Sequence, residues 1–314
     1  MADGCPEQIS GIQPPHLRRH LDPAAHILPR RYWNPFECQG DLPDRLLGEK
    51  KEERRGETLM LLLSIEEITK EYDGIIALDR ISLKVEKGSI KGLIGPNGAG
   101  KSTLFHLISG VEKPDLGKIY FKGREITSME SHEISALGMG RTFQTLQIWG
   151  NMTVVENIMA GMNRRLKGGL FSCGLWLPWI RRSEKEALKE AKEILDSLGL
   201  LGKWESIASQ LPYGKQKLLE LGRALAMKPE LLLLDEPASG LTLAEMRQLS
   251  EQISQIRQEG VTVFIVEHHM GMVMEIADKI AVLHHGELIA EGTPEAVRRN
   301  PQVIEAYLTR RNPN

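Results

Sequence analysis

One short segment constrains the fold of this chain more than any other. Residues 95–102 read Gly-Pro-Asn-Gly-Ala-Gly-Lys-Ser and fit the pattern GxxxxGK followed by serine or threonine. They follow the segment Ile90–Ile94, which predicts a strand after the turn at Glu86–Gly88. The residues after them place Leu104, Leu107 and Ile108 on one side of a helix. A glycine-rich turn between strand and helix points backbone N–H groups at one spot, so it predicts a phosphate-binding loop.

The pattern assigns chemistry to individual residues of this loop. Lys101 is expected to reach the β- and γ-phosphates of a nucleotide, and Ser102 to bind Mg²⁺. The predicted nucleotide-binding residues of the segment are Gly95, Pro96, Asn97, Gly98, Ala99, Gly100, Lys101, Ser102 and Thr103.

An apolar run, Leu231–Leu234, predicts a buried strand that ends in Asp235 and Glu236. Alone, two such acids more often mark a strand end that is exposed to solvent. The phosphate loop upstream favours a catalytic role for them. Because side chains alternate along a strand, both carboxylates cannot point at one metal ion. We therefore predict that Asp235 binds Mg²⁺ and that Glu236 acts on water.

The composition and the periodicity of the sequence change near residue 60. Residues 1–59 hold seven of the 16 prolines and show no helical or strand period, so we expect a disordered extension. The segment Lys50–Glu57 can be encoded by purine codons alone, as in a ribosome-binding site. We expect translation to start at Met60 and residues 60–314 to form the functional domain.

Apolar strands alternate with helical patterns after residue 60, which predicts an α/β fold whose parallel sheet is covered on both faces. Residues 145–228 are rich in helical patterns and predict a helical insertion. The clearest helix there is Ser183–Leu198, with the serine as its cap.

Composition excludes several classes of protein. Forty Lys and Arg residues against 42 Asp and Glu leave no basic excess, so nucleic acid is not an expected partner. The uncharged stretch Gly168–Ile180 is shorter than the roughly 20 residues that span a bilayer. Three cysteines without CxxC spacing predict neither a disulfide framework nor a zinc site.

From about residue 61 the chain resembles the ATPase subunits of ABC transporters. The resemblance implies ATP and Mg²⁺ as cofactors, and a P-loop ABC-type ATPase with a mostly parallel core sheet, an antiparallel β subdomain and a helical subdomain. It also implies that Tyr72 stacks on adenine and that Gln144, in Arg141-Thr-Phe-Gln144, touches Mg²⁺ and the attacking water. Gly214 would contact a partner's γ-phosphate, and His268 would position the water.

Some positions depart from the family pattern. Leu211-Pro-Tyr-Gly-Lys-Gln216 takes the place of the LSGGQ signature, so Pro212 and Tyr213 replace its serine and first glycine. Thr242 and His269 stand where many relatives carry aspartate.

The resemblance is closer to ATPases of branched-chain amino acid uptake. It rests on Arg141–Gln144 with Asn151–Asn157, an insertion around Gly168–Arg182, and the tail Gly292–Leu308. It implies a second and different ATPase subunit, separate transmembrane permease subunits, and indirect action with a periplasmic or extracellular solute-binding protein. Such a subunit lies peripherally on the cytoplasmic face of the membrane.

Other functions stay open at this point. Relatives of that branch also serve urea, amides and other small solutes. A non-transport ABC ATPase would usually carry two cassettes or a long coiled coil. A GTP-dependent switch would need an NKxD or TKxD motif, which the sequence lacks.

Overall fold

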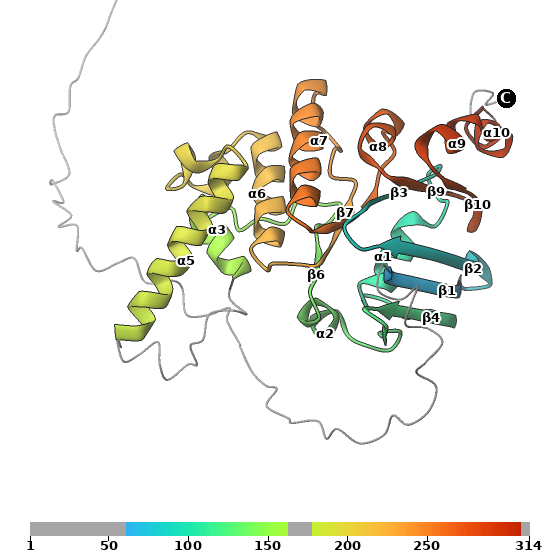
Figure 1. Cartoon of the computed structure of the whole chain (residues 1–314), viewed down its shortest axis with the longest axis horizontal. Coiled ribbons are helices and arrows are strands. Elements are labelled where there is room, and N and C mark those ends of the chain that lie inside the picture. The colour runs from blue at the N-terminus through green and yellow to red at the C-terminus, as the bar shows by residue number, and fades with distance from the viewer. Residues whose placement is uncertain (1–60, 163–177, 309–314) are drawn as a thin grey trace, which may run out of the picture. The chain divides into compact units, whose positions relative to one another are not determined.

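The computed structural model describes residues 61–162 and 178–308 (Figure 1). The predicted extension, residues 1–59, lies outside the described residues, as does most of the insertion around residues 168–182. The interpretation of both segments therefore stays a prediction.

Strands of the described residues form two sheets. Their bounds are β1 Leu61–Tyr72, β2 Ile75–Glu86, β3 Ile90–Ile94, β4 Leu116–Phe121, β5 Arg124–Glu125, β6 Met139–Arg141, β7 Leu231–Asp235, β8 Thr262–Val266, β9 Lys279–His284 and β10 Glu287–Gly292. The larger sheet has the order β10-β9-β3-β8-β7-β6, with only β10 antiparallel to its neighbour. The smaller sheet, β2-β1-β4-β5, is antiparallel throughout. The predicted mostly parallel core sheet with an antiparallel β subdomain is confirmed.

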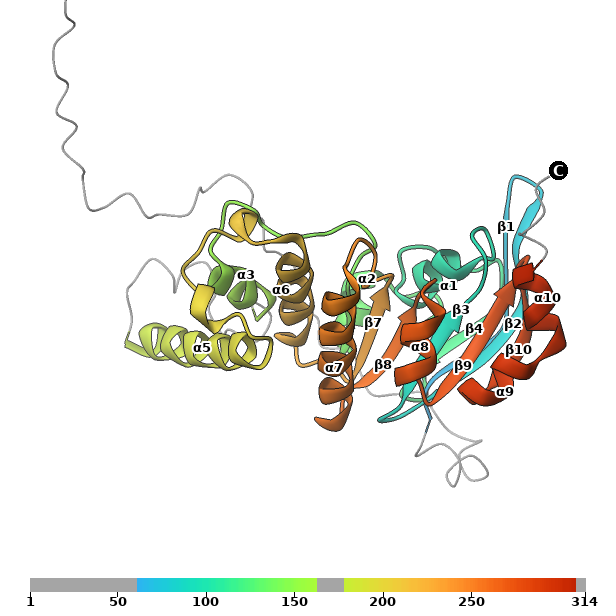
Figure 2. The same ribbon diagram turned by 90° about the horizontal axis from the view of Figure 1, so that it is seen from above.

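Helices cover the larger sheet and extend beyond its β6 edge. Their bounds are α1 Lys101–Ile108, α2 Ser131–Ala136, α3 Val154–Gly161, α5 Pro178–Ser197, α6 Tyr213–Leu225, α7 Leu243–Gln258, α8 Met270–Ile276, α9 Pro294–Arg299 and α10 Pro301–Leu308. Short 3-10 turns cover Leu201–Lys203 and Ala208–Gln210. Figure 2 shows α7 and α8 lying along the parallel sheet, with α3, α5 and α6 grouped beyond α7.

The predicted start of the long helix is wrong. Helix α5 begins at Pro178 and ends at Ser197, so Ser183 lies inside the helix and cannot cap it. Proline is favoured in the first turn of a helix because the N–H that it lacks would have no intrahelical partner there.

The larger sheet separates two hydrophobic cores. On β7, Leu232 and Leu234 pack with residues of the surrounding helices, whereas Leu231 and Leu233 pack with α1 and the antiparallel sheet. Every residue of β3, β7 and β8 is buried. A strand that is covered on both faces favours apolar side chains, which explains the apolar runs of β7 and β8. In β3 the buried Lys91 pairs with Glu291.

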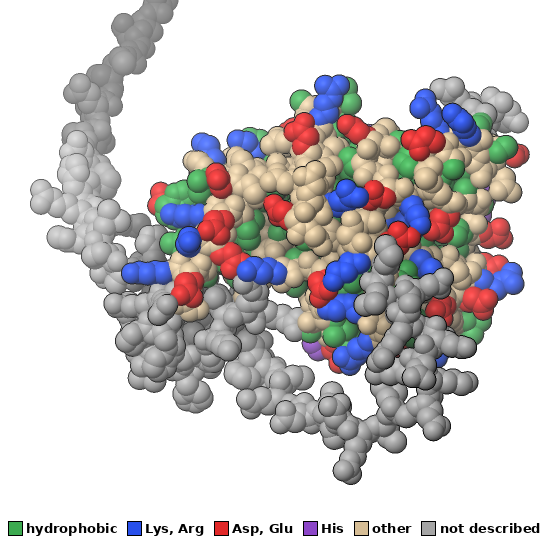
Figure 3. Space-filling model, in the orientation of Figure 1, with side chains coloured by type: hydrophobic (Ala, Val, Ile, Leu, Met, Phe, Trp, Pro, Cys, Tyr) green, Lys and Arg blue, Asp and Glu red, His purple; other side chains and the backbone are tan. Residues whose placement is uncertain are grey.

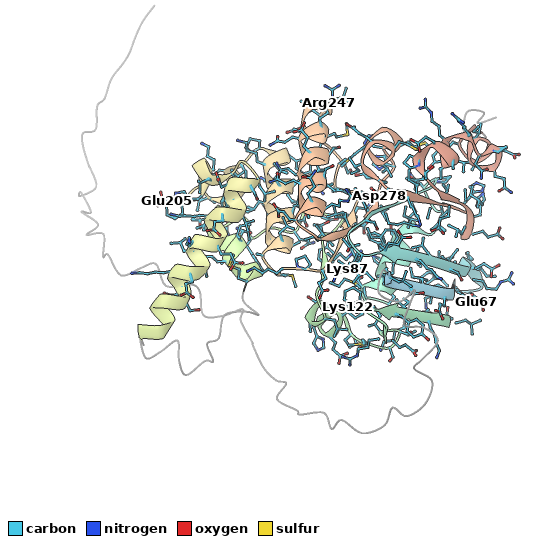
Figure 4. All side chains as sticks on the ribbon, in the orientation of Figure 1. Glu67, Lys87, Lys122, Glu205, Arg247 and Asp278 are labelled. Atoms are coloured by element: carbon cyan, nitrogen blue, oxygen red, sulfur yellow. The ribbon has the colours of Figure 1, made fainter. Side chains whose placement is uncertain are left out.

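Ion pairs tie the antiparallel sheet to the parallel one. Glu230, just before β7, pairs with Lys122 after β4 and lies 3.7 Å from the ammonium of Lys87 after β2. Figure 4 shows the two lysines near each other in the middle of the view. Each partly exposed ion pair of this kind contributes little to stability. The hydrophobic cores therefore provide most of the attachment between the two sheets.

The surface is mixed in charge on the face that Figure 3 shows, where Lys and Arg side chains are interspersed with Asp and Glu. Within residues 61–162 and 178–308, no helix has both the length and the apolar character that crossing a membrane requires.

Candidate active site

The glycine-rich loop joins the buried strand β3 to helix α1. Gly100 directly precedes α1 with a φ of 97°, a left-handed conformation that favours glycine. A Cβ atom at this position would lie 2.7 Å from the carbonyl oxygen of Ala77. The backbone can therefore follow this turn only with glycine, and the turn presents the N-terminus of α1 to an anion.

Lys101, the first residue of α1, is almost fully buried. Its ammonium group donates hydrogen bonds of 2.8 Å to the carbonyl oxygens of Gly95 and Pro96. The positive charge of Lys101 therefore lies against the backbone of the glycine-rich loop. Phosphate oxygens accept stronger hydrogen bonds from an ammonium than neutral carbonyls do, because both partners are charged.

A cavity of about 390 Å³ opens in front of this loop. Its lining residues are Ala77, Asn97, Gly98, Gly100, Lys101, Ser102, Thr103, Gln144, Glu236 and His268. All of them except Ala77 are residues that the sequence placed in the site. The structure brings the loop, at one end of β3, together with residues that follow three other strands.

Three of those residues converge on one carboxylate. Gln144 follows β6, Glu236 follows β7 and His268 follows β8, three neighbouring strands of the parallel sheet. The Gln144 amide nitrogen donates to Glu236 Oε2 at 3.1 Å, and His268 Nδ1 lies 3.8 Å from the same oxygen. The carboxyl ends of parallel strands meet at one edge, which is why residues so far apart in sequence meet there.

The two adjacent acids lie in different surroundings, and strand alternation is not the reason. Strand β7 ends at Asp235, and Glu236 has a φ of 46°, so strand alternation does not extend to it. A non-glycine residue with this φ is uncommon, and such strain is frequent at functional sites. Asp235 is 2% exposed and does not line the cavity, whereas Glu236 does.

Sequence reasoning missed a third acid, Glu267. Its side chain is 0% exposed and accepts hydrogen bonds from the backbone N–H of Ala238 at 2.7 Å and of His268 at 3.1 Å. Glu267 therefore joins the loop after β7 to the loop after β8, and so fixes the backbone around Glu236 and His268. The sequence did contain a signal for Glu267, because it follows an apolar strand, as Asp235 ends one.

Tyr72 lies at the end of β1, outside the cavity lining and with 40% of its surface exposed. Its hydroxyl donates a hydrogen bond to the carboxylate of Glu112. Burial of the hydroxyl and this neighbouring carboxylate raise the pKa of Tyr72 to about 12. The ammonium of Lys70 lies over the ring, 5.3 Å from its centroid. The stacking of Tyr72 on adenine stays a prediction.

Gly214 lies in the first turn of α6, also outside the cavity lining. A Cβ atom there would lie 2.3 Å from Glu245 Oε1 of helix α7, so the site is closely packed. Pro212 precedes α6 and provides no side-chain cap.

Thr242 is the N-cap of α7. Its hydroxyl accepts a hydrogen bond from the Glu245 N–H, and the Glu245 carboxylate accepts one from the Thr242 N–H. Thr242 and Glu245 thus form a capping box.

Helix α6 holds the loop that carries Gln144. Glu220, 3% exposed, accepts hydrogen bonds from the backbone N–H of Gln147 at 3.1 Å and of Phe143 at 3.5 Å. The buried ammonium of Lys217 donates to the carbonyl oxygen of Gln144 at 3.4 Å. The helix that begins at the signature turn is thereby attached to the loop that reaches Glu236.

A second cavity, of about 410 Å³, lies behind this loop. Its lining is mostly apolar, and it is built from residues of α2, β6, α3, α6 and the segments next to them. The lining residues are Ser109, Val111, Ser131, Ile134, Ser135, Met139, Arg141, Phe143, Trp149, Ala160, Gly161, Arg223, Ala224 and Met227.

We predict that Glu220→Gln makes stability less dependent on pH. Burial raises the pKa of Glu220, so the folded protein binds a proton there more tightly than the unfolded chain does. The free energy of unfolding then decreases as pH rises from the unfolded pKa through the folded one. Glutamine keeps an acceptor oxygen without the charge, so the melting temperature of Glu220→Gln relative to the unsubstituted chain should be higher at pH 8 than at pH 5.

The control for this measurement is Glu251→Gln, on an exposed position of α7. The melting temperature of Glu251→Gln relative to the unsubstituted chain should be the same at pH 5 and at pH 8. A Glu220→Gln variant that loses equal stability at pH 5 and pH 8 would contradict the assignment of a buried, costly charge.

Comparison with known proteins places this site in a family. The model of the ABC transporter family matches residues 78–239, and that of the branched-chain amino acid ATP-binding cassette transporter matches residues 287–308. The high-affinity branched-chain amino acid transport ATP-binding protein LivG of Salmonella typhimurium is 41% identical over 248 residues, which are 79% of this chain and 97% of the relative. BraF of Pseudomonas aeruginosa is 40% identical over 249 residues, with the same coverage.

Solved structures agree. The crystal structure of the ADP conformation of an ATP-binding cassette of an ABC transporter has a TM-score of 0.70 and 36% identity, and covers 79% of this chain and 99% of that one. A nucleotide-free cassette has a TM-score of 0.69 and 35% identity, with the same coverage. These matches confirm the predicted resemblance, the predicted fold and the ATPase class. The chain belongs to the ATP-binding subunits of ABC transporters, in the branch that includes the branched-chain amino acid transport ATP-binding proteins.

Proposed function

We propose that this chain is the ATP-hydrolysing subunit of an importer that takes up branched-chain amino acids through separate permease subunits. The observation that carries the proposal is the convergence of Lys101, Gln144, Glu236 and His268 on one cavity in front of the phosphate loop. The family supplies the transport context, and the named relatives supply the solute class.

The triphosphate would lie on the loop and the first turn of α1. Backbone N–H groups and the positive end of the helix dipole favour an anion there. The Lys101 ammonium would exchange its carbonyl partners, Gly95 and Pro96, for phosphate oxygens. Asn97, Gly98 and Thr103 line the same cavity and would contact the phosphates or ribose.

The residues present fit a magnesium ion. Ser102 and Gln144 line the cavity and offer neutral oxygens, the ligand type that Mg²⁺ prefers. Asp235 has one carboxylate oxygen, Oδ1, that is buried without a hydrogen-bond partner in the described part of the chain. Buried polar atoms are rarely left in this state, so a metal ion or its bound water is a suitable partner. When bound, Mg²⁺ neutralises charge on the phosphates.

Hydrolysis would depend on Glu236. Its carboxylate is oriented by Gln144 and lies next to His268, so it can accept a proton from the water that attacks the γ-phosphate. Gln144 and His268 would hold that water in place. Glu267 supports both loops from behind, which keeps these distances short before the nucleotide arrives.

Substitution of Glu236 tests this role. Glu236→Gln should keep ATP binding and lose hydrolysis by about 10²- to 10⁴-fold, the usual contribution of a general base. Lys101→Ala should weaken ATP binding itself. Binding is measured with a fluorescent ATP analogue and hydrolysis by phosphate release from the reconstituted transporter. Glu259→Gln, on an exposed position at the end of α7, is the matched control. Unchanged turnover in the Glu236 variant would remove it from the mechanism.

A second ATPase subunit would complete each site. Gly214 and the signature turn lie outside the cavity of their own chain, as a residue that serves a partner's nucleotide should. Pro212 has no hydroxyl where the signature carries serine, so this chain supplies one ligand fewer to its partner. We infer a heterodimer, in which a different subunit contributes the fuller signature.

The isolated chain should accordingly be mostly monomeric in ATP and a weak ATPase. Sedimentation velocity with the Glu236→Gln variant, which retains ATP, measures the association state. A tight homodimer that also supports full transport without a second ATPase would refute the heterodimer.

The second cavity is the proposed contact for the permease. It is mostly apolar, Phe143 and Trp149 on its wall are both exposed, and its wall includes the start of the Gln144 loop. A permease segment seated there would contact Phe143 and so act on the neighbouring Gln144 through the backbone of the loop. The chain would then lie on the cytoplasmic face of the membrane without spanning it.

The solute is tested by transport, because no part of this chain needs to touch it. Deleting the gene should abolish uptake of labelled leucine, isoleucine or valine and leave urea uptake intact. Loss of urea uptake alone would move the assignment to another solute of the same branch. Intact uptake of both, with loss of export of another compound, would overturn import.

A further inference from the structure

Arg141, the last residue of β6, joins three elements through one guanidinium group. Nη2 donates to Asp235 Oδ2 at the end of β7 at 3.0 Å. Nη1 donates to the hydroxyl of Ser109, which caps the end of α1, at 2.6 Å. Both side chains of the ion pair are almost fully buried. The guanidinium is therefore fixed by two partners on different elements.

This arrangement makes the two oxygens of Asp235 unequal. Oδ2 is bound by Arg141, whereas Oδ1 has no hydrogen-bond partner among the described residues. A carboxylate that is held through one oxygen cannot rotate freely, so the other oxygen is presented in one fixed direction. An outer partner of this kind typically orients a metal ligand and raises its affinity.

We propose that Arg141 is a positioning residue for the magnesium site: it fixes the Asp235 carboxylate through Oδ2 and leaves Oδ1 for the metal or its bound water. The inference rests on the proposed function, in which Asp235 serves Mg²⁺. Arg141 lines the second cavity and not the nucleotide cavity. It acts through Asp235.

The chemistry of arginine explains the residue type. A planar guanidinium presents N–H groups in a fixed fork, so it can bind Asp235 and Ser109 at once with both partners in place. Lysine has one nitrogen on a flexible stem and cannot hold the carboxylate in the same way. Removing the charge altogether would leave Asp235 buried without its counterion, which is strongly unfavourable.

Metal binding, measured on the full chain, tests the proposal. Mn²⁺ binding in the presence of ATP is followed by electron paramagnetic resonance, and ATP binding without metal is followed with a fluorescent analogue in EDTA. Arg141→Met should raise the half-saturating Mn²⁺ concentration by about 10- to 100-fold, the usual cost of losing an outer partner of a metal ligand. Metal-free ATP binding should stay as in the unsubstituted chain.

Two further variants keep the result decisive. Arg141→Lys retains the charge and should fold even where Arg141→Met does not, and it should still raise the half-saturating Mn²⁺ concentration about 10-fold. Arg257→Met breaks another arginine–aspartate pair, with Asp278 at 3.0 Å, at the amino end of β3 and so opposite the phosphate loop, and should leave Mn²⁺ binding unchanged.

A double-mutant cycle separates positioning from general damage. In an Asp235→Asn background, Arg141→Lys should have no additional effect on Mn²⁺ binding, because its route to the metal is already lost. An Arg141→Lys variant that binds Mn²⁺ as tightly as the unsubstituted chain would overturn the proposal. If the unsubstituted chain binds Mn²⁺ no better with ATP than without it, the proposed function itself fails, which is a different result.

Discussion

Burial of the parallel sheet on both faces is the constraint on which the rest of this structure depends. Helices cover strands β3, β7 and β8 on one side, and α1 with the antiparallel sheet covers them on the other. Their side chains therefore pack into two cores. The loops at the carboxyl ends are where polar residues can gather, and four strands deliver them to the same edge. The nucleotide cavity is the result, with the loop after β3 facing the residues that follow β6, β7 and β8.

Buried acids hold that edge in shape. Glu267 joins the loops after β7 and β8, Glu220 holds the backbone of the Gln144 loop from α6, and Asp235 pairs with Arg141. Each acid binds backbone N–H groups or a guanidinium, so none is left as an isolated buried charge. The cavity residues therefore rest on a layer of fixed polar contacts, in which Glu220 and Lys217 attach α6 to the Gln144 loop.

Much of the fold and of the candidate site was predictable from the sequence, for reasons that are local. The loop at residues 95–102 and the apolar runs before Asp235 and His268 each carry their pattern within a few residues, and strand order then brings their ends together. Arg141 and Glu220 were not predictable, because their partners lie 94 and 73 residues away in sequence. The cap at Ser183 failed for a local reason, since Pro178 begins the helix earlier.

The four leucines of β7 give the Arg141–Asp235 pair one more consequence. Leu231–Leu234 are chemically identical, so sliding the strand by one residue would exchange leucine for leucine at three positions and bring Glu230 or Asp235 to the fourth. In most strands a one-residue slip moves apolar side chains to the wrong face, and that penalty selects the register. Here that penalty is confined to the end of the strand, where one charged residue would enter a core. A slipped β7 would also separate Asp235 from Arg141, and breaking a buried ion pair costs about 3–5 kcal/mol. The Arg141–Asp235 pair thus favours the observed register of β7.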